Sequence, residues 1–173
     1  TPTPVPTQPA PETAAQPTTA PVSLPTANTS DPQKVWDMDG TCYYAMEFYG
    51  DANYPPDTVV KAGTEFEKQW RVKNTGTCTW NMGTTEKDDN NNDVFAVKYP
   101  VQLIFSGGDQ MSGSPVNSID RNVEPGDVTT VTVKLGAPMT AGTYTGYWVL
   151  GGPNNLRFYY LNNLSLGVRI TVP

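Results

Sequence analysis

The sequence contains no histidine, so it lacks the side chain that most often serves as a catalytic base or metal ligand near neutral pH. Ordinary serine or cysteine triads and histidine-based metal sites are therefore excluded. Carboxylate pairs such as Glu65 with Glu67 remain, but pairs of this kind are far more often solvated surface than glycosidase machinery. We expect a protein that is not an enzyme and that has no cofactor.

Basic residues are also scarce, because 11 lysines and arginines stand against 17 acidic residues, for a formal net charge of -6. Nucleic acids and anionic lipids bind clustered basic side chains, and the sequence has no such cluster. No stretch approaches the roughly 20 apolar residues of a membrane span. The sequence begins at Thr1 inside a Thr-Pro run, as a processed or trimmed chain would, so we expect any signal peptide or membrane tether to lie upstream.

Only two cysteines are present, Cys42 and Cys78, and each stands beside a predicted strand with aromatic neighbours. An even pair in an exported β domain favours one disulfide. The alternative is a pair of buried free thiols. A two-cysteine zinc site fits less well, because zinc takes four nitrogen or sulfur ligands and no histidine is available.

Residues 1–34 form the first of two predicted parts, an extended tail or stalk. Residues 1–32 hold nine prolines, eight threonines and no aromatic residue, so this segment cannot bury enough apolar surface to fold. Frequent proline favours the polyproline II conformation, at about 3.1 Å per residue. The segment suits O-glycosylation as well as it suits an unmodified linker, and the candidate acceptors are Thr1, Thr3, Thr7, Thr13, Thr18, Thr19 and Thr26.

Residues 35–173 form the second predicted part, in which apolar and polar residues alternate with period two. Such alternation is typical of half-buried strands, and we find no apolar stripe of helical period. We expect an all-β fold, an immunoglobulin-like antiparallel β-sandwich of about seven to nine strands preceded by the extended tail. The alternating segments are 42–49, 66–72, 101–105, 131–135, 144–150 and 166–170.

Glycines mark three predicted type II turns between these strands. Gly63, Gly126 and Gly142 each occupy the third position of a four-residue turn, where this turn type requires positive φ. Tyr144 follows the third turn and is placed to act as a tyrosine corner, with its hydroxyl bonded back to the backbone and its ring in the core.

Several motifs resemble the four-tryptophan Ig-like domain family, found in a eukaryotic autophagy receptor and, behind Thr/Pro-rich stalks, in bacterial surface proteins and lipoproteins. The resemblance covers about residues 42–172. The motifs are Pro56-Asp57-Thr58, the run from Lys68 to Trp80, Phe105-Ser106-Gly107-Gly108-Asp109, Val123-Glu124-Pro125-Gly126, Ala137-Pro138 and the run from Ala141 to Trp148.

The resemblance implies core roles for three of the family's tryptophans, at Trp70, Trp80 and Trp148, and it supports pairing of Cys42 with Cys78. The family's fourth tryptophan is missing, since Leu166-Gly167-Val168 stands in its place. The segment 84–99 is also longer than the usual connection. The resemblance implies a non-catalytic sandwich that binds other macromolecules or spaces domains.

The acidic run 86–93 is a weak candidate for an ion site. Asp89, Asn91 and Asp93 place oxygen ligands at alternate positions, as in a calcium loop. However, Val94 and Pro100 stand where an EF-hand has its glycine and its bidentate glutamate. We therefore favour a solvated turn over calcium.

Two functions are consistent with these features. The first is an extracellular or cell-surface structural subunit, of filament or sheath type, that self-associates when its tail adds to the edge of a neighbouring sandwich, although proline limits such pairing. The alternative is a surface-tethered binding module for glycan or protein, because some of the many tyrosines should face outward, where rings stack on sugars or anchor interfaces. The equally simple interpretation of these tyrosines is ordinary strand residues. N-glycosylation sequons begin at Asn28 and Asn163.

Overall fold

The computed structural model describes residues 34–83, 85–87, 89–90, 93–95, 100–152, 156–159 and 164–173. Within these ranges the secondary structure consists of strands, with no helix. They are β1 (Val35–Trp36), β2 (Tyr43–Tyr44), β3 (Met46–Asp51), β4 (Thr58–Val59), β5 (Glu65–Asn74), β6 (Thr85–Lys87), β7 (Asp93–Phe95), β8 (Gln102–Gly108), β9 (Val116–Ser118), β10 (Val128–Gly136), β11 (Gly142–Gly151), β12 (Arg157–Phe158) and β13 (Leu166–Val172).

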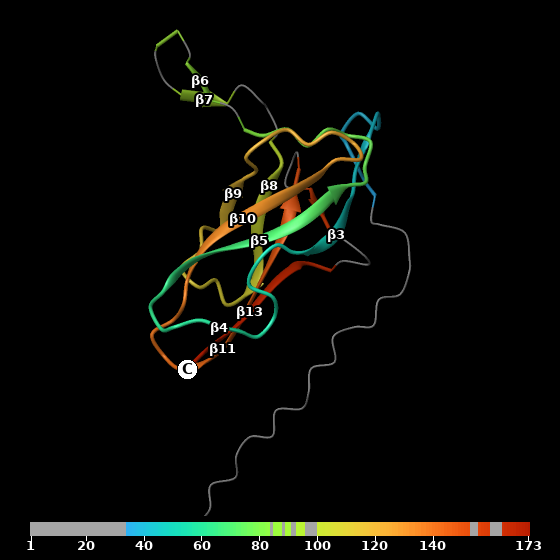
Figure 1. Ribbon diagram of the computed structural model, residues 1–173. Helices are drawn as coiled ribbons and strands as arrows, with labels where there is room; N and C mark the ends of the chain where they lie inside the picture. The colour runs from blue at the N-terminus through green and yellow to red at the C-terminus, as the bar shows by residue number, and fades with distance from the viewer. Residues whose placement is uncertain are drawn as a thin grey trace, which may run out of the picture.

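Two sheets form the sandwich. A three-stranded sheet has the order β10-β5-β3, and a six-stranded sheet has the order β4-β13-β11-β8-β9 with β12 beside β11. Figure 1 shows the first sheet as a layer in front of the second. Strand pairs are antiparallel except β4 with β13. The two layers confirm the predicted sandwich and its strand number, while β1–β2 and β6–β7 form separate two-stranded pairs.

The pairing of β5 with β10 is the most regular part of the sandwich. Nine residues of β10 pair without a register shift, from Val128 opposite Lys73 to Gly136 opposite Glu65. Even-numbered residues of β5 point inward and odd-numbered residues point outward, as the sequence alternation predicts. The inward set of β10 is Thr129, Val131, Val133 and Leu135.

The core is built around the three tryptophans, and each has 0% of its surface exposed. The rings of Trp70 and Trp148 lie 5.9 Å apart, and Phe105 packs edge-on to Trp148 at 5.2 Å. Trp80 packs against Phe158 at 5.5 Å. Large aromatic rings supply much of the buried apolar area of a small sandwich, so these contacts join the two sheets.

Two of the three predicted turns are confirmed. Gly63 has a φ of 71° in the turn 61–64, and Gly126 has a φ of 92° in the turn 124–127. A backbone hydrogen bond closes each turn between its first and last residues, at 3.1 and 3.0 Å respectively. Positive φ favours glycine at both positions.

The third turn, at 140–143, is not of the predicted type. Gly142 has a φ of 159°, nearly extended, and it already begins β11. The predicted tyrosine corner is confirmed, because the Tyr144 hydroxyl donates a hydrogen bond to the Thr140 carbonyl at 2.9 Å. This bond fastens the chain where it enters β11.

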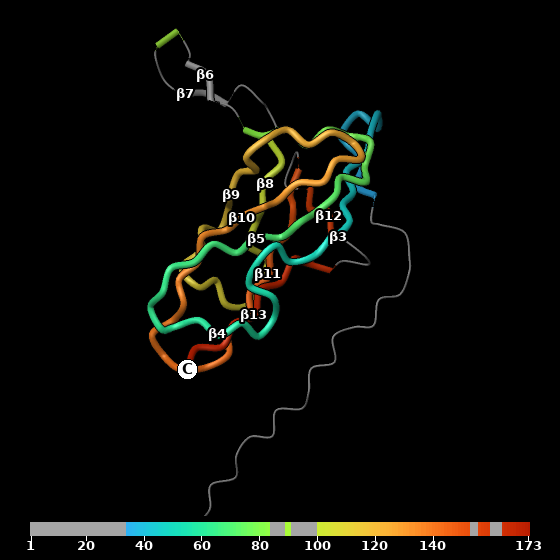
Figure 2. The backbone as a smooth tube through the Cα atoms, in the orientation of Figure 1, coloured from blue at the N-terminus to red at the C-terminus, as the bar shows by residue number. Residues whose placement is uncertain are grey.

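The two ends of the sandwich carry different segments. The C-terminus and β4 lie at one end, whereas the blue segment with β1 and β2 lies at the opposite end (Figure 2). In the part of the chain that the structure describes, no helix has the length and apolar character that a membrane span needs.

Candidate interaction surface

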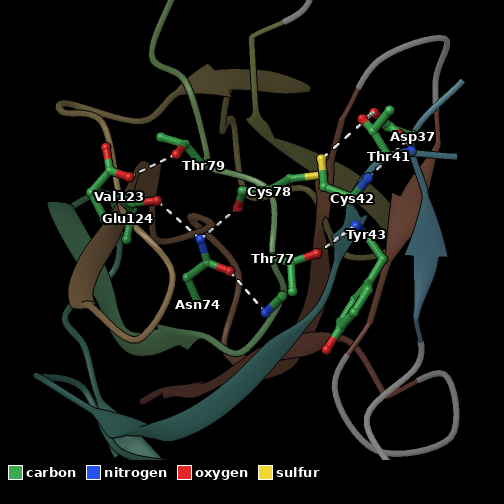
Figure 3. Close-up of a disulfide and its surroundings, with 11 residues drawn as sticks. Asp37, Thr41, Cys42, Tyr43, Asn74, Thr77, Cys78, Thr79, Val123 and Glu124 are labelled. Atoms are coloured by element: carbon green, nitrogen blue, oxygen red, sulfur yellow. Dashed lines mark hydrogen bonds between the residues drawn. A yellow bond between two sulfur atoms is a disulfide. The ribbon is translucent and has the colours of Figure 1, made fainter. Parts of the chain in front are cut away.

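A disulfide joins the segment before β2 to the loop after β5. Cys42 and Cys78 lie 36 residues apart in sequence, and their Cα atoms are 5.1 Å apart (Figure 3). The same two segments meet where the Tyr43 N–H donates to Thr77 Oγ1 at 3.0 Å. Gly76 permits this approach, because a Cβ there would lie 2.3 Å from the Tyr43 carbonyl oxygen. The structure therefore contains the disulfide that the sequence favoured, and the thiol alternative is wrong.

Asp37 caps the turn beside the disulfide. Its carboxylate accepts hydrogen bonds at 2.7 Å from the Thr41 hydroxyl and the Thr41 N–H, and one at 3.2 Å from the Cys42 N–H. The Thr41 hydroxyl is the main cause that lowers the pKa of Asp37, and backbone donors add to it. Asp37 and the two sulfur atoms lie within 4.8 Å of one another, but sulfurs joined to each other cannot act as thiolate ligands. This cluster is a disulfide site.

Asn74 connects three segments at the same end. Its Nδ2 donates to the carbonyls of Cys78 and Val123 at 2.9 and 3.0 Å, and its Oδ1 accepts the Gly76 N–H at 3.0 Å (Figure 3). The side chain is fully buried, and three of its polar sites are paired. The end of β5 is thereby tied to the disulfide loop and to the loop before β10.

Lys68 is the other polar residue with no exposed surface within the described ranges. Its ammonium group donates to the Asp51 carboxylate, to the Asn53 carbonyl at 2.7 Å and to the Tyr54 carbonyl at 3.0 Å. It also lies 5.3 Å from the centre of the Trp70 ring. Burial lowers the pKa of Lys68, and the bond and charge of Asp51 oppose this shift.

The buried tryptophans differ in how their indole N–H groups are paired. Trp70 Nε1 donates to the Gly167 carbonyl at 2.8 Å, which links the two sheets. Trp80 and Trp148 have buried Nε1 atoms without a hydrogen-bond partner in the part of the chain that is described. Trp70, Trp80 and Trp148 are thus core residues, and none of these three presents a ring for ligands.

The outer edge of β10 forms one edge of the sandwich. β10 is an end strand of the three-stranded sheet, and β5 is its neighbour on the other side. The Gly136 N–H is bonded to the Met111 carbonyl at 2.7 Å, and the Val128 carbonyl accepts Arg121 Nη2 at 2.8 Å. Both partners come from segments outside the sheet. Backbone groups alternate in direction along a strand. The N–H and C=O groups of the even-numbered residues of β10 therefore point away from β5.

Three residues between these anchored ends remain open. Thr130, Thr132 and Lys134 point their N–H and C=O groups outward, and no described residue pairs with these groups. The two threonine side chains are half-buried, and the Lys134 side chain is 85% exposed. The strand contains no proline and only one charged residue. An edge with these properties is a template for another strand.

The other sheet edges are protected in ways that β10 is not. β3 carries a register shift between Phe48 and Gly50, with the charged residues Glu47 and Asp51 on either side. β9 is three residues long and β4 only two. Bulges, charge and shortness are the usual means by which proteins prevent edge pairing. β10 is therefore the edge that favours strand addition.

A groove of about 770 Å³ lies at the Gly136 end of β10. Met111 and Ser112 form part of its wall and have positive φ, at 49° and 56°, in a turn closed by the Gly113 N–H bonded to the Gln110 carbonyl at 2.9 Å. Lining residues are Gly63, Glu65, Phe66, Glu67, Met111, Ser112, Lys134, Leu135, Gly136, Ala137, Pro138 and Met139. The groove has both apolar and polar walls, including two glutamates and one lysine, and it continues the open edge through Lys134, Leu135 and Gly136.

Comparison with known proteins identifies the sandwich. A family model described as the Ig-like domain from next to BRCA1 gene matches residues 53–172. The chain belongs to this Ig-like family. The match contains β5, β10 and Cys78, whereas Cys42 and β1 to β3 precede it, so the disulfide joins the family domain to the segment before it.

Two relatives match this chain over about a hundred residues each. Protein ILRUN of Danio rerio is 29% identical over 104 residues, which is 60% of this chain and 30% of that protein. Next to BRCA1 gene 1 protein of Mus musculus is 33% identical over 102 residues, which is 58% of this chain and 9% of that protein. The chain thus spans less than a third of either relative. A family 123 glycoside hydrolase from Clostridium perfringens overlays on 68% of this chain and 22% of its own, at 12% identity and a TM-score of 0.36, which carries no argument about activity.

The Ig-like domain also carries an exposed tyrosine on its six-stranded sheet. Tyr147 is 45% exposed and stands between Gly107 of β8 and Gly167 of β13, directly opposite both. A Cβ on Gly167 would meet the Tyr147 ring at 3.7 Å, so the ring lies against this glycine. Sequence reasoning expected some of the tyrosines to face outward, and Tyr147 is one that does.

Other predicted sites are only partly covered by the structure. Asp89 is exposed, Asp93 begins β7 opposite Lys87, and Asn91 lies outside the described residues, so the calcium site stays a prediction. The threonines proposed for glycosylation, the whole of residues 1–33 and both sequon asparagines also lie outside them. The domain boundary after residue 34 therefore remains a prediction.

Sequence reasoning missed two polar connections. Asn74 stands at an inward position of the β5 alternation, and a polar residue there was a detectable signal. Arg169 forms two hydrogen bonds of 2.6 Å with the Asp57 carboxylate, which fixes the turn before β4 to β13. The bonds from Arg169 lower the pKa of Asp57. Asp57 was known only as part of a family motif.

Proposed function

We propose that this chain is an extracellular interaction and assembly subunit without a catalytic role. Its Ig-like sandwich joins other protein chains by accepting a strand at the outer edge of β10. The observation that carries this proposal is the open backbone of Thr130, Thr132 and Lys134 on a nine-residue strand without bulge or proline. Strand addition uses main-chain hydrogen bonds for affinity and neighbouring side-chain pockets for specificity.

The disulfide supports the extracellular part of the proposal. Disulfides persist in oxidising compartments and are rare where thiols are kept reduced. The pair Cys42–Cys78 holds the family domain to the segment that leads into it. A subunit exposed outside the cell would keep this connection, and cell-surface localisation is part of the proposal.

Substitution of Thr132 tests the assembly role. Thr132→Pro removes an outward N–H and places a ring against any added strand, whereas Thr132→Ala changes the same side chain and keeps the N–H. We expect the native chain and Thr132→Ala to self-associate with rising concentration, and Thr132→Pro to remain monomeric. Light scattering after size exclusion measures the mass, and far-UV circular dichroism checks the fold. Equal association of all three proteins would overturn the proposal.

A second candidate function is glycan binding, favoured by Tyr147. An exposed ring between two glycines offers an unobstructed face, and sugar rings stack on such faces. If this function is present, a glycan array finds a ligand for the native chain that Tyr147→Ala does not retain. Tyr49→Ala is the matched control, because Tyr49 is 48% exposed on the other sheet. Binding that both variants keep, or an array without hits, would remove this candidate.

A further inference from the structure

The prolines in the middle of the N-terminal segment follow a pattern that matches the open edge, whereas the four prolines outside it, at 2, 4, 6 and 32, are even-numbered. Between residues 8 and 31 every proline is odd-numbered, at Pro9, Pro11, Pro17, Pro21 and Pro25. Every even-numbered residue in this stretch therefore keeps its backbone N–H. A strand that pairs along one side uses the N–H and C=O groups of alternate residues only. Proline is tolerated at the intervening residues, whose N–H would face solvent.

Within that stretch, residues 20–24 are the part best suited to form a strand. Val22 and Leu24 are even-numbered, and besides Val5 they are the only large aliphatic residues of residues 1–33. Valine favours strands, whereas the rest of the stretch consists mainly of Ala, Pro and Thr, of which only Thr favours strands. The length also fits, because the open residues of β10 run from Thr130 to Lys134 and so span five positions.

We propose that residues 20–24 of one copy pair as an added strand with the β10 edge of a second copy. The backbone groups of Ala20, Val22 and Leu24 face the outward groups of Thr130, Thr132 and Lys134. The backbone groups of Pro21 and Ser23 face away from β10. This inference rests on the proposed function and names the partner at the same edge.

The positions of donor and acceptor make the contact heterologous. The donor segment precedes β1, which leads through β2 to β3, and β3 is the opposite edge of the sheet from β10. Donor and acceptor are therefore two different parts of one copy. Contacts of this kind form open filaments when the rotation between copies does not close a ring.

A pair of proline variants in the full chain tests the donor. Val22→Pro puts proline at a position that faces β10, and Ser23→Pro puts it at a position that faces away. Both substitutions add one proline, and both lie before the first strand of the sandwich. We expect Val22→Pro to weaken self-association by at least about tenfold, as the loss of one or more hydrogen bonds implies, and Ser23→Pro to leave it within about twofold. Sedimentation velocity over a concentration series measures both. Equal behaviour of the two variants would overturn the inference.

Mixing two defective chains distinguishes pairing between copies from pairing within one chain. A Val22→Pro chain keeps its acceptor edge, and a Thr132→Pro chain keeps its donor segment. At a concentration where each variant alone is monomeric, we expect the equimolar mixture to form a dimer that grows no further. A mixture that stays monomeric would overturn pairing with a second copy.

The same variants separate failure of this inference from failure of the proposed function. Loss of assembly in Thr132→Pro together with retention in Val22→Pro contradicts the donor and leaves β10 as the acceptor of another strand. Retention of assembly in Thr132→Pro contradicts β10 as the acceptor edge and therefore also residues 20–24 as its donor. Loss of assembly in Thr132→Pro and in Val22→Pro, together with retention in Ser23→Pro, supports the proposed function and this inference.

Discussion

The disulfide end of the sandwich and the outer edge of β10 treat their polar groups in opposite ways. At the disulfide end, the carboxylate of Asp37 and the amide of Asn74 pair with backbone groups of neighbouring loops. Along β10, three consecutive outward positions have no partner among the described residues. At the disulfide end the hydrogen bonds hold the chain together, whereas the groups along β10 remain available to another strand.

This difference indicates where stability and where binding should respond to substitution. Buried groups that lose a partner cost free energy of unfolding, because water cannot replace the lost bond. Outward edge groups are solvated in a single copy, so a change there alters association far more than stability. The predictions below test this division.

Removal of the disulfide should have the largest effect on stability. A cross-link that closes a loop of 36 residues contributes about 4 kcal/mol in the loop-entropy description. The variant with both Cys42→Ala and Cys78→Ala should lose about this amount of unfolding free energy in urea denaturation. The native chain under a dithiol reductant should lose a similar amount. A loss below about 1 kcal/mol would mean that the Asn74 network alone holds this end.

Asn74→Ala should be nearly as harmful, with a loss of about 3 kcal/mol. The substitution leaves the Cys78 carbonyl and the Gly76 N–H without their partner in a buried place, and the Val123 carbonyl keeps only the Trp80 N–H. Thr79→Ala is the control, because the exposed Thr79 hydroxyl bonds only to the Glu124 carboxylate, at 2.7 Å. Thermal and urea unfolding should place this control within about 0.5 kcal/mol of the native chain. Similar losses for both variants would contradict the role assigned to Asn74.

Proline substitutions along β10 test the edge itself. Thr132→Pro should cost less than about 1 kcal/mol, because its N–H points away from β5. Val133→Pro should cost about 3 kcal/mol or more, because its N–H points toward β5 and the ladder loses a bond. Urea unfolding of both variants at a concentration where the native chain is monomeric gives the comparison. If Thr132→Pro is the more harmful of the two, the direction assigned to the backbone groups of β10 is wrong.

Local alternation predicted which residues are inside but not which strands are neighbours. The inward faces of 66–72 and 131–135 follow from period two, and the structure confirms them. The openness of β10 depends on the absence of a strand beside it, and the sheet order is not encoded in one local pattern. The partners of Asn74 are similarly remote, since they come from two loops brought together by the disulfide and the turn 124–127.

Turn chemistry shows the same limit on a smaller scale. The glycines of the first two turns have the positive φ that the pattern predicts, but Gly142 begins β11 with nearly extended backbone. There the hydroxyl of Tyr144, bonded to the Thr140 carbonyl, holds the chain at its entry into β11 without a type II turn. A glycine at the expected place is therefore compatible with two backbone conformations, and the longer-range bond shows which one is present.

The smallest expected effect concerns the exposed ion pair at the end opposite the disulfide. Asp57 has a φ of 67°, which asparagine also tolerates, so Asp57→Asn removes the charge without backbone strain. Since Arg169 lowers the pKa of Asp57, the stabilisation is fully present above the ordinary carboxyl pKa of 3.8 and is lost as the pH falls through the lower pKa of the folded protein. Melting temperatures of the two proteins should therefore differ slightly at pH 6 and converge in acid. A difference that stays constant down to the acid limit would show that asparagine acts there through packing and that the charge contributes nothing.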